Sequence, residues 1–201
     1  MNPTSPSPIR LVLASSSPYR RELLAKLGLP FETASPHLDE TPFPGETPSQ
    51  LSLRLAEAKA RALRQGFPAH LIIGSDQVAM LDGAQLGKPG NAGQAVAQLR
   101  AASGKRVEFF TSVCVLDSAT GEAGLATDRT VVQFRELTDR QIECYVAKER
   151  PFDCAGGFKS ESLGIALLTK LETNDPNALV GLPLLALVGL LESFGLDILG
   201  E

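Results

Sequence analysis

The chain has 201 residues, of which 43% are hydrophobic and 21% charged, and a formal net charge of −4. This composition is that of an ordinary globular protein long enough to bury a sizeable core. The net negative charge argues against binding of bulk duplex nucleic acid, which needs a basic surface. It does not argue against binding of small anionic ligands.

The N-terminal part begins with a Pro- and Ser-rich lead-in over 1–8, which we expect to be flexible. Residues 9–14 are apolar and predict a short strand. Ser17 is a good N-cap for a helix over 18–27, because its side chain can accept a hydrogen bond from a free backbone N–H. With a second strand expected over 31–34, this part predicts a strand–helix–strand unit.

Two further helix starts each place a Gln three residues after a Thr, and this spacing is typical of a capping box. The pairs are Thr47 with Gln50 and Thr138 with Gln141, and the helices are expected to reach about residues 64 and 148. The remaining strands and helices are expected over 71–75, 78–81, 84–86, 91–102, 106–117, 126–134 and 165–171. A tight turn at Asp82–Gly83 is expected to join 78–81 to 84–86 as a hairpin. This order predicts an α/β or mixed α+β protein with a mixed sheet, as one domain or two closely joined lobes.

The odd number of cysteines and their lack of metal-binding spacing predict reduced thiols, mostly buried, as in a cytosol. They are Cys114, Cys144 and Cys154. The longest apolar run, over 178–191, is short for a membrane span and is interpreted as core helix.

The candidate reactive group is Asp76, which follows an apolar segment and is expected to end a strand. A carboxylate there can hold a divalent cation or a water, and Lys88, between Gly and Pro, can neutralise phosphate charge. Glu40 could share the cation with Asp76. An ordinary turn Asp and a surface-loop Glu remain the alternatives.

A second candidate is an anion site at the start of the helix over 18–27, because free N–H groups and the helix dipole favour phosphate there. Arg20 lies in the first turn, where a cation is unfavourable unless an anion compensates it. Lys59 is a further candidate for phosphate contact. The alternative is a solvated basic patch beside an ordinary cap.

Glu161 follows a glycine pair on a loop that is expected to be flexible. Its carboxylate can accept two hydrogen bonds from the N1–H and N2–H₂ edge of guanine, and other bases would leave it unpaired or repel it. A surface-loop Glu is again the alternative.

Taken together, the order of these segments resembles the Maf family of nucleotide pyrophosphatases. The matching segments are LASSSPYRRELL at 13–24, DE at 39–40, LAEAKA at 55–60, GSDQV at 74–78, LGKP at 86–89, CAG at 154–156 and KSE at 159–161. The segments at 75–78 and 159–161 are similar to the YceF-type subgroup, which hydrolyses 7-methyl-GTP to the monophosphate and pyrophosphate.

The resemblance implies an elongated α/β fold like that of inosine triphosphatases, with a nucleotide cleft between two lobes of a single domain over 9–201. It also implies a divalent cation, Mg²⁺ or Mn²⁺, and a cytoplasmic setting. The implied partner is a small nucleotide, without nucleic acid or membrane, and a homodimer is compatible with the family.

Carried over by position, Asp76 is implied as the group that accepts the proton of the attacking water. The cation that it could share with Glu40 remains an expectation from the residues themselves. Substrate selection falls to Tyr19, Gln77 and Glu161. The residues that surround the triphosphate are Ser15, Ser17, Arg20, Lys59 and Lys88.

Two departures from the family pattern affect the predicted identity of the base more than the predicted reaction. Tyr19 stands where the subgroup often has Trp, although a Tyr face can still attract a cationic methylated guanine. Ser162 stands where the family tends to have Gly. Two alternatives stay open: a pyrophosphatase for dTTP, UTP or another nucleotide, and a non-catalytic nucleotide-binding regulator of septum formation.

Overall fold

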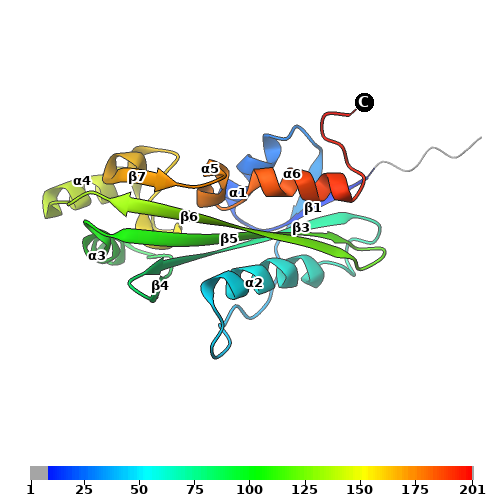
Figure 1. Cartoon of the computed structure of the whole chain (residues 1–201), viewed down its shortest axis with the longest axis horizontal. Coiled ribbons are helices and arrows are strands. Elements are labelled where there is room, and N and C mark those ends of the chain that lie inside the picture. The colour runs from blue at the N-terminus through cyan, green and yellow to red at the C-terminus, as the bar shows by residue number, and fades with distance from the viewer. Residues whose placement is uncertain (1–8, 201) are drawn as a thin grey trace, which may run out of the picture.

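A computed structural model describes residues 9–200, so the lead-in predicted over 1–8 lies outside the described residues. The molecule is elongated, and a mixed sheet runs along its length with helices on both faces (Figure 1). The predicted mixed α/β architecture is thereby confirmed.

Seven strands form this sheet in the order β2-β1-β3-β5-β6-β7, and β4 pairs with β3 outside that path. β1 is parallel to β2 and β3, and all other pairs are antiparallel. The strands are β1 (Leu11–Ala14), β2 (Phe31–Ala34), β3 (Leu71–Leu81), β4 (Ala84–Leu86), β5 (Arg106–Asp117), β6 (Ala123–Phe134) and β7 (Leu168–Glu172).

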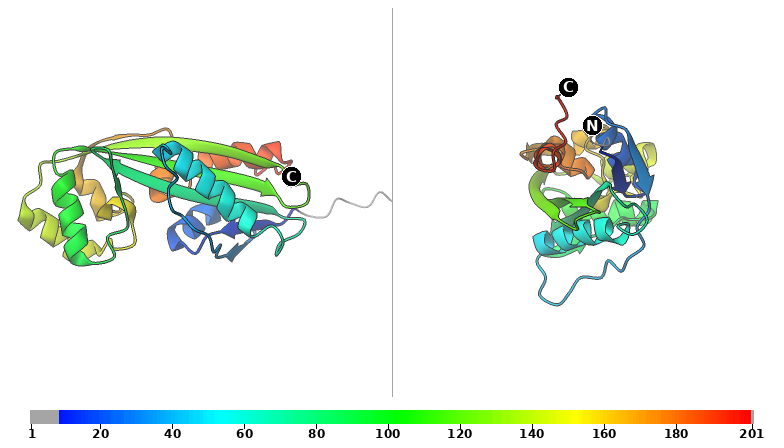
Figure 2. Two further views of the ribbon diagram at one scale, coloured as in Figure 1. Left: turned by 90° about the horizontal axis from the view of Figure 1, so that it is seen from below. Right: turned by 90° about the vertical axis from the view of Figure 1, so that its right-hand side faces the viewer.

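The helices are α1 (Pro18–Ala25), α2 (Pro48–Ala62), α3 (Ala92–Ala102), α4 (Asp139–Glu149), α5 (Pro176–Val180) and α6 (Leu184–Ser193). α2 and α6 cover opposite faces of the sheet, while α3 and α4 gather at one end of the molecule (Figure 2). Alternate residues of β3 make this possible, since Ile72 packs with α2 and Ile73 with α6.

Two large apolar clusters occupy the two ends of the sheet and define two lobes. One joins α3 and α4 to the sheet and includes Phe109 and Phe134, whereas the other joins α1 and α6 to β1 and includes Leu24. The long strands β3 and β5 run through both lobes and connect them. Over residues 9–200 no helix has the length and apolar character that a membrane crossing requires.

Local sequence signals locate several helix starts and turns correctly. Both predicted capping boxes are present, at Thr47 with Gln50 and at Thr138 with Gln141. The turn Asp82–Gly83 joins β3 to β4 with positive φ at both residues, as a tight hairpin requires.

The prediction that a strand ends at Asp76 is wrong, because β3 continues to Leu81. The parallel pairing with β1 stops at Gly74, but antiparallel pairing with β5 continues through Met80 and keeps the backbone extended. β4 then pairs from Ala79 onward. Within the described part of the chain, residues 75–78 therefore have a strand partner on one side only.

Three other expectations need correction. β7 begins at Leu168 rather than at 165, because residues 163–167 form a 3₁₀ turn in which the Ile165 N–H donates to the Ser162 carbonyl. The apolar run over 178–191 forms two helices separated at Gly181–Pro183. Of the three free cysteines only Cys114 is buried, and Cys144 is exposed on α4.

Candidate active site

A cleft of about 550 Å³ opens where β3 lacks a strand partner on one side, and its size suits a nucleotide. The start of α1 and the end of α5 border it, together with the β4 hairpin and the loop after α4. All ten side chains predicted for the site line this cleft: Ser15, Ser17, Tyr19, Arg20, Glu40, Lys59, Asp76, Gln77, Lys88 and Glu161.

The centre of the cleft holds two carboxylates that share one ammonium group. Lys59 Nζ lies 2.6 Å from Asp76 Oδ1 and 2.8 Å from Glu40 Oε1. The Lys59 and Asp76 side chains are each 9% exposed, whereas that of Glu40 is 56% exposed. Burial makes the Lys59–Asp76 pair costly to separate, because either charge alone would be desolvated without a partner.

A glycine on β3 allows α2 to bring Lys59 to Asp76. A Cβ at Gly74 would collide with the Ala56 carbonyl oxygen and lie 2.9 Å from the Ala60 nitrogen. The backbone of α2 therefore lies directly on β3, two residues before Asp76.

The charges around Asp76 have opposing effects on its pKa. Burial raises the pKa of the Asp76 carboxyl above its ordinary value, and the charges of Lys59 and Arg20 counteract the rise. Burial likewise lowers the pKa of the Arg20 guanidinium, against the charges of Asp76 and Glu40. A buried carboxylate with a raised pKa in a cleft is suited to accept a proton.

The start of α1 is organised by its own serine hydroxyls. Ser15 Oγ accepts the Ser17 N–H at 3.1 Å, and Ser17 Oγ accepts the Arg20 N–H at 3.4 Å. Each hydroxyl keeps its own proton, which it can donate to a phosphate oxygen. Arg20 is held separately, since its Nε donates to the Gly181 carbonyl at 2.8 Å.

The cleft offers two carboxylates as ligands for a divalent cation. Across residues 9–200 no group of three or more His, Cys, Asp and Glu side chains could hold a metal ion. Glu40 and Asp76 nevertheless bring two carboxylates to one cationic group. Mg²⁺ is commonly held by one or two carboxylates together with substrate phosphates, so this donor set fits Mg²⁺ or Mn²⁺ when a polyphosphate is bound.

The other end of the cleft is formed by Tyr19 and the loop after α4. The Tyr19 hydroxyl donates to Asp153 Oδ1 at 3.1 Å, and Lys159 Nζ lies 5.6 Å from the centroid of the Tyr19 ring. Burial is the main cause of the raised pKa of Tyr19, which keeps the ring neutral. A neutral aromatic face attracts cations, and the nearby Lys159 ammonium is one example.

The loop that carries Glu161 is anchored to α4 on both sides of this residue. The Lys159 N–H donates to Tyr145 Oη at 2.9 Å, and the Leu163 N–H donates to Glu149 Oε2 at 3.1 Å. The Glu161 side chain itself is exposed at the cleft. The loop predicted to be flexible is thus tied down around an exposed carboxylate.

Gln77 lines the cleft, but its amide is engaged in holding α5. Its Nε2 lies 3.0 Å from Thr111 Oγ1, 3.1 Å from the Ala178 carbonyl oxygen and 3.0 Å from the Leu179 carbonyl oxygen, so its two N–H bonds are shared among three acceptors. These bonds position the segment that leads to Gly181. A direct role of Gln77 in base selection stays a prediction.

Asp153 is a cleft residue that the sequence analysis did not single out. Its carboxylate accepts the Tyr19 hydroxyl, although 134 residues separate the two in the sequence. The one local signal is its place directly before Cys154, where the matching segment 154–156 begins.

Comparison with known proteins gives a consistent result. Residues 10–194 match the profile of the family described as Maf-like protein. The "7-methyl-GTP pyrophosphatase" of Nitrosococcus oceani is 55% identical over 199 residues, covering 99% of this chain and 100% of that protein. The protein of the same name from Vibrio vulnificus is 54% identical over 191 residues, covering 95% and 98%. A solved HAM1 protein from Coxiella burnetii is 14% identical with a TM-score of 0.46, covering 65% and 75%.

Proposed function

Because the chain belongs to the family of Maf-like proteins, we propose that it hydrolyses 7-methyl-GTP to 7-methyl-GMP and pyrophosphate. The observation that carries the proposal is Asp76, a buried carboxylate with a raised pKa in a cleft of nucleotide size. The names of the relatives, at 54–55% identity over nearly the whole chain, supply the substrate.

In the proposed reaction a water oxygen attacks the α-phosphorus and forms a new P–O bond. The α–β phosphoanhydride bond breaks, pyrophosphate leaves, and the Asp76 carboxylate accepts the proton of the water. Lys59, Lys88, Arg20 and the N–H groups at the start of α1 oppose the charge that develops on the leaving pyrophosphate.

Asp76 and Glu40 are the residues that would hold Mg²⁺ or Mn²⁺. Such a cation supplies positive charge to the phosphate oxygens. Lys59 contacts both carboxylates and keeps them close together despite their like charges.

Base selection is assigned to the Tyr19 end of the cleft. The ring of Tyr19 offers a face to the positively charged methylated guanine, and Glu161 offers two acceptor oxygens to the guanine edge. A cytoplasmic location, a free nucleotide rather than nucleic acid as ligand, and a homodimer are further parts of this proposal.

Pyrophosphate release with Mg²⁺ or Mn²⁺ tests the proposal across 7-methyl-GTP, GTP, dTTP, UTP and CTP. We expect preference for 7-methyl-GTP, and turnover lowered by on the order of 10³-fold or more in Asp76→Asn. Substantial activity of Asp76→Asn would remove Asp76 from the reaction. Preference for dTTP or UTP would keep the reaction and discard the base assignment. Nucleotide binding without release would favour the regulator.

A further inference from the structure

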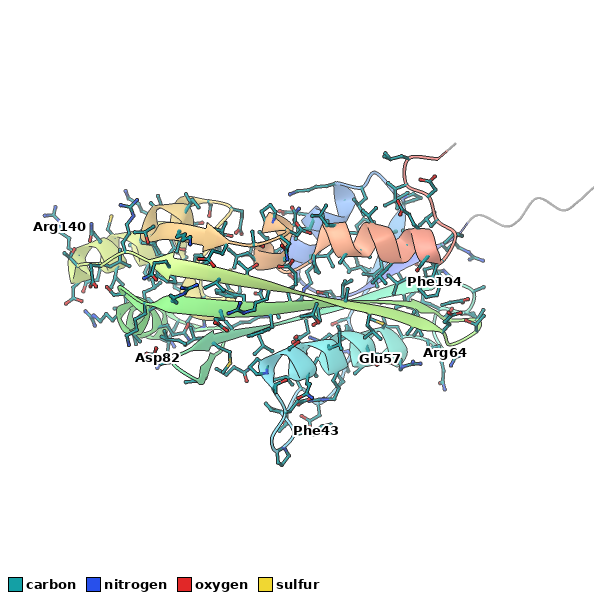
Figure 3. The ribbon with its side chains drawn as sticks, in the orientation of Figure 1. Phe43, Glu57, Arg64, Asp82, Arg140 and Phe194 are labelled. Carbon is teal, nitrogen blue, oxygen red and sulfur yellow. The ribbon has the colours of Figure 1, made fainter. Side chains whose placement is uncertain are left out.

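The loop between β2 and α2 projects away from the sheet, with Phe43 near its tip (Figure 3). It carries Glu40, one of the two carboxylates that contact Lys59. Because the Glu40 side chain is 56% exposed, its ion pair with Lys59 is too weakly stabilising to order the loop by itself. Another contact must hold Glu40 in place.

Arg54, on α2, makes that contact with three residues of the loop. Its Nε and Nη2 donate to Glu46 Oε1 at 2.6 Å and Oε2 at 2.8 Å. Nη2 also donates to the Thr41 carbonyl at 3.1 Å, and the guanidinium carbon lies 4.0 Å from the centroid of the Phe43 ring. One side chain thus joins both arms of the loop to the helix.

The loop closes around Arg54 through its own hydrogen bonds. Asp39 Oδ1 accepts the Thr41 N–H at 2.9 Å, and Glu46 Oε2 accepts the Phe43 N–H at 3.0 Å. The Glu46 side chain is only 8% exposed, and its hydrogen bonds with Arg54 lower its pKa to about 2. A bidentate pair of this kind fixes orientation as well as distance, which a lysine cannot reproduce.

Arg54 and Lys59 hold neighbouring residues of the loop from the same helix. Arg54 bonds the backbone of Thr41, and Lys59 pairs with the side chain of Glu40. We infer that Arg54 is a positioning residue for the reaction: it holds the loop against α2 so that the Glu40 carboxylate stays at Lys59 in the cleft. This inference rests on the proposed function for its effect on turnover, but not for its effect on the loop.

The test compares Arg54→Lys with Arg61→Lys, the same substitution on the same helix. Arg61 pairs with Glu57 and contacts the Gly121 carbonyl, away from the loop. For Arg54→Lys we expect kcat/KM to fall on the order of 10-fold and amide hydrogen exchange over 39–46 to become faster. For Arg61→Lys we expect neither change.

A double-mutant cycle separates positioning from general damage. If Arg54 acts through Glu40, then Arg54→Lys should cost less than about 2-fold in kcat/KM when Glu40→Gln is already present. A full additional loss in that background would overturn the inference. Glu46→Gln is the second probe if Arg54→Lys does not fold, since it removes one charge of the same pair and keeps its shape.

The two readouts also separate this inference from the proposed function. If the unmodified protein releases no pyrophosphate from any nucleotide, the proposed function fails, and hydrogen exchange still decides whether Arg54 holds the loop. Unchanged exchange in Arg54→Lys would overturn the inference. Faster exchange with unchanged turnover would also overturn it, because the contact would then be structural only.

Discussion

At one end of the cleft Asp76 and Lys59 are buried and paired, while at the other Tyr19 is half-buried and Glu161 is exposed. The first end is built from β3 and α2, whereas Glu161 lies on the loop after α4. The difference indicates that the proposed reaction depends on the packed sheet and helix. The proposed base selection depends on a loop that presents the exposed Glu161 side chain to the cleft.

The two ends also differ in energetic cost. Burying two charges is unfavourable, and their pairing repays the cost only while both partners are present. An exposed carboxylate such as Glu161 carries no such cost. Substitutions at the first end should therefore harm folding and turnover together, and substitutions at the second should change selectivity alone.

The largest effect is expected for Lys59→Met. It leaves Asp76 buried without its partner, so the free energy of unfolding should fall by about 3 kcal/mol in a urea titration. Turnover should fall by on the order of 10³-fold, because the phosphates lose a buried cation.

The double variant Lys59→Met with Asp76→Asn is the control for this prediction. It removes the unpaired charge, so stability should recover in part while turnover stays low. Equal instability of the single and double variants would contradict the idea that an unpaired carboxylate causes the loss.

Glu161→Gln should lower kcat/KM for 7-methyl-GTP by on the order of 10²-fold, since the amide cannot accept both guanine hydrogen bonds. The urea midpoint should not move, because the side chain is exposed. An unchanged order of nucleotide preference would remove Glu161 from base selection and break the proposed division between the two ends.

The pH dependence of turnover should report the environment of Asp76. Burial raises the pKa of this carboxyl. The acid limb of a plot of log kcat/KM against pH should therefore have an apparent pKa above the ordinary value for Asp. The charge of Glu40 contributes to that rise, so Glu40→Gln should move the limb to lower pH. Glu161→Gln should leave it in place, and a shift of the Glu40 variant to higher pH would contradict the assignment.

The smallest effect is expected at Arg150, the C-cap residue of α4, which has a φ of 48°. Arg150→Gly should raise the free energy of unfolding by about 1 kcal/mol, since glycine adopts this conformation without strain. Lys148→Gly, within the same helix, should lower it by about 1 kcal/mol. A loss of turnover in Arg150→Gly would show that the strain serves the site.

The sequence predicted those features of the fold that depend on neighbours in the chain. The capping boxes at Thr47 and Thr138 and the Asp82–Gly83 turn are local hydrogen-bonding and backbone preferences, and they are confirmed. The family assignment is confirmed as well, because several short segments in a fixed order are more specific than any one of them.

Features that depend on distant partners were missed. Asp76 lies inside a strand because β5 continues to pair with β3, and nothing near Asp76 in the sequence indicates this. Asp153 was missed because its partner Tyr19 is remote in the sequence. The contacts of Arg54 with Thr41 and Glu46 depend on how the loop folds back, which neither periodicity nor composition records.

The close approach of α2 to β3 at Gly74 limits how this site can vary. Any side chain there must push away the turn of α2 that contains Ala56 and Ala60, and Lys59 would move with it. An assay would register Gly74→Ala as a defect in catalysis, although residue 74 is not among the residues that line the cleft. The distance between the Asp76 carboxylate and the Lys59 ammonium therefore depends on residue 74 having a hydrogen atom in place of a side chain.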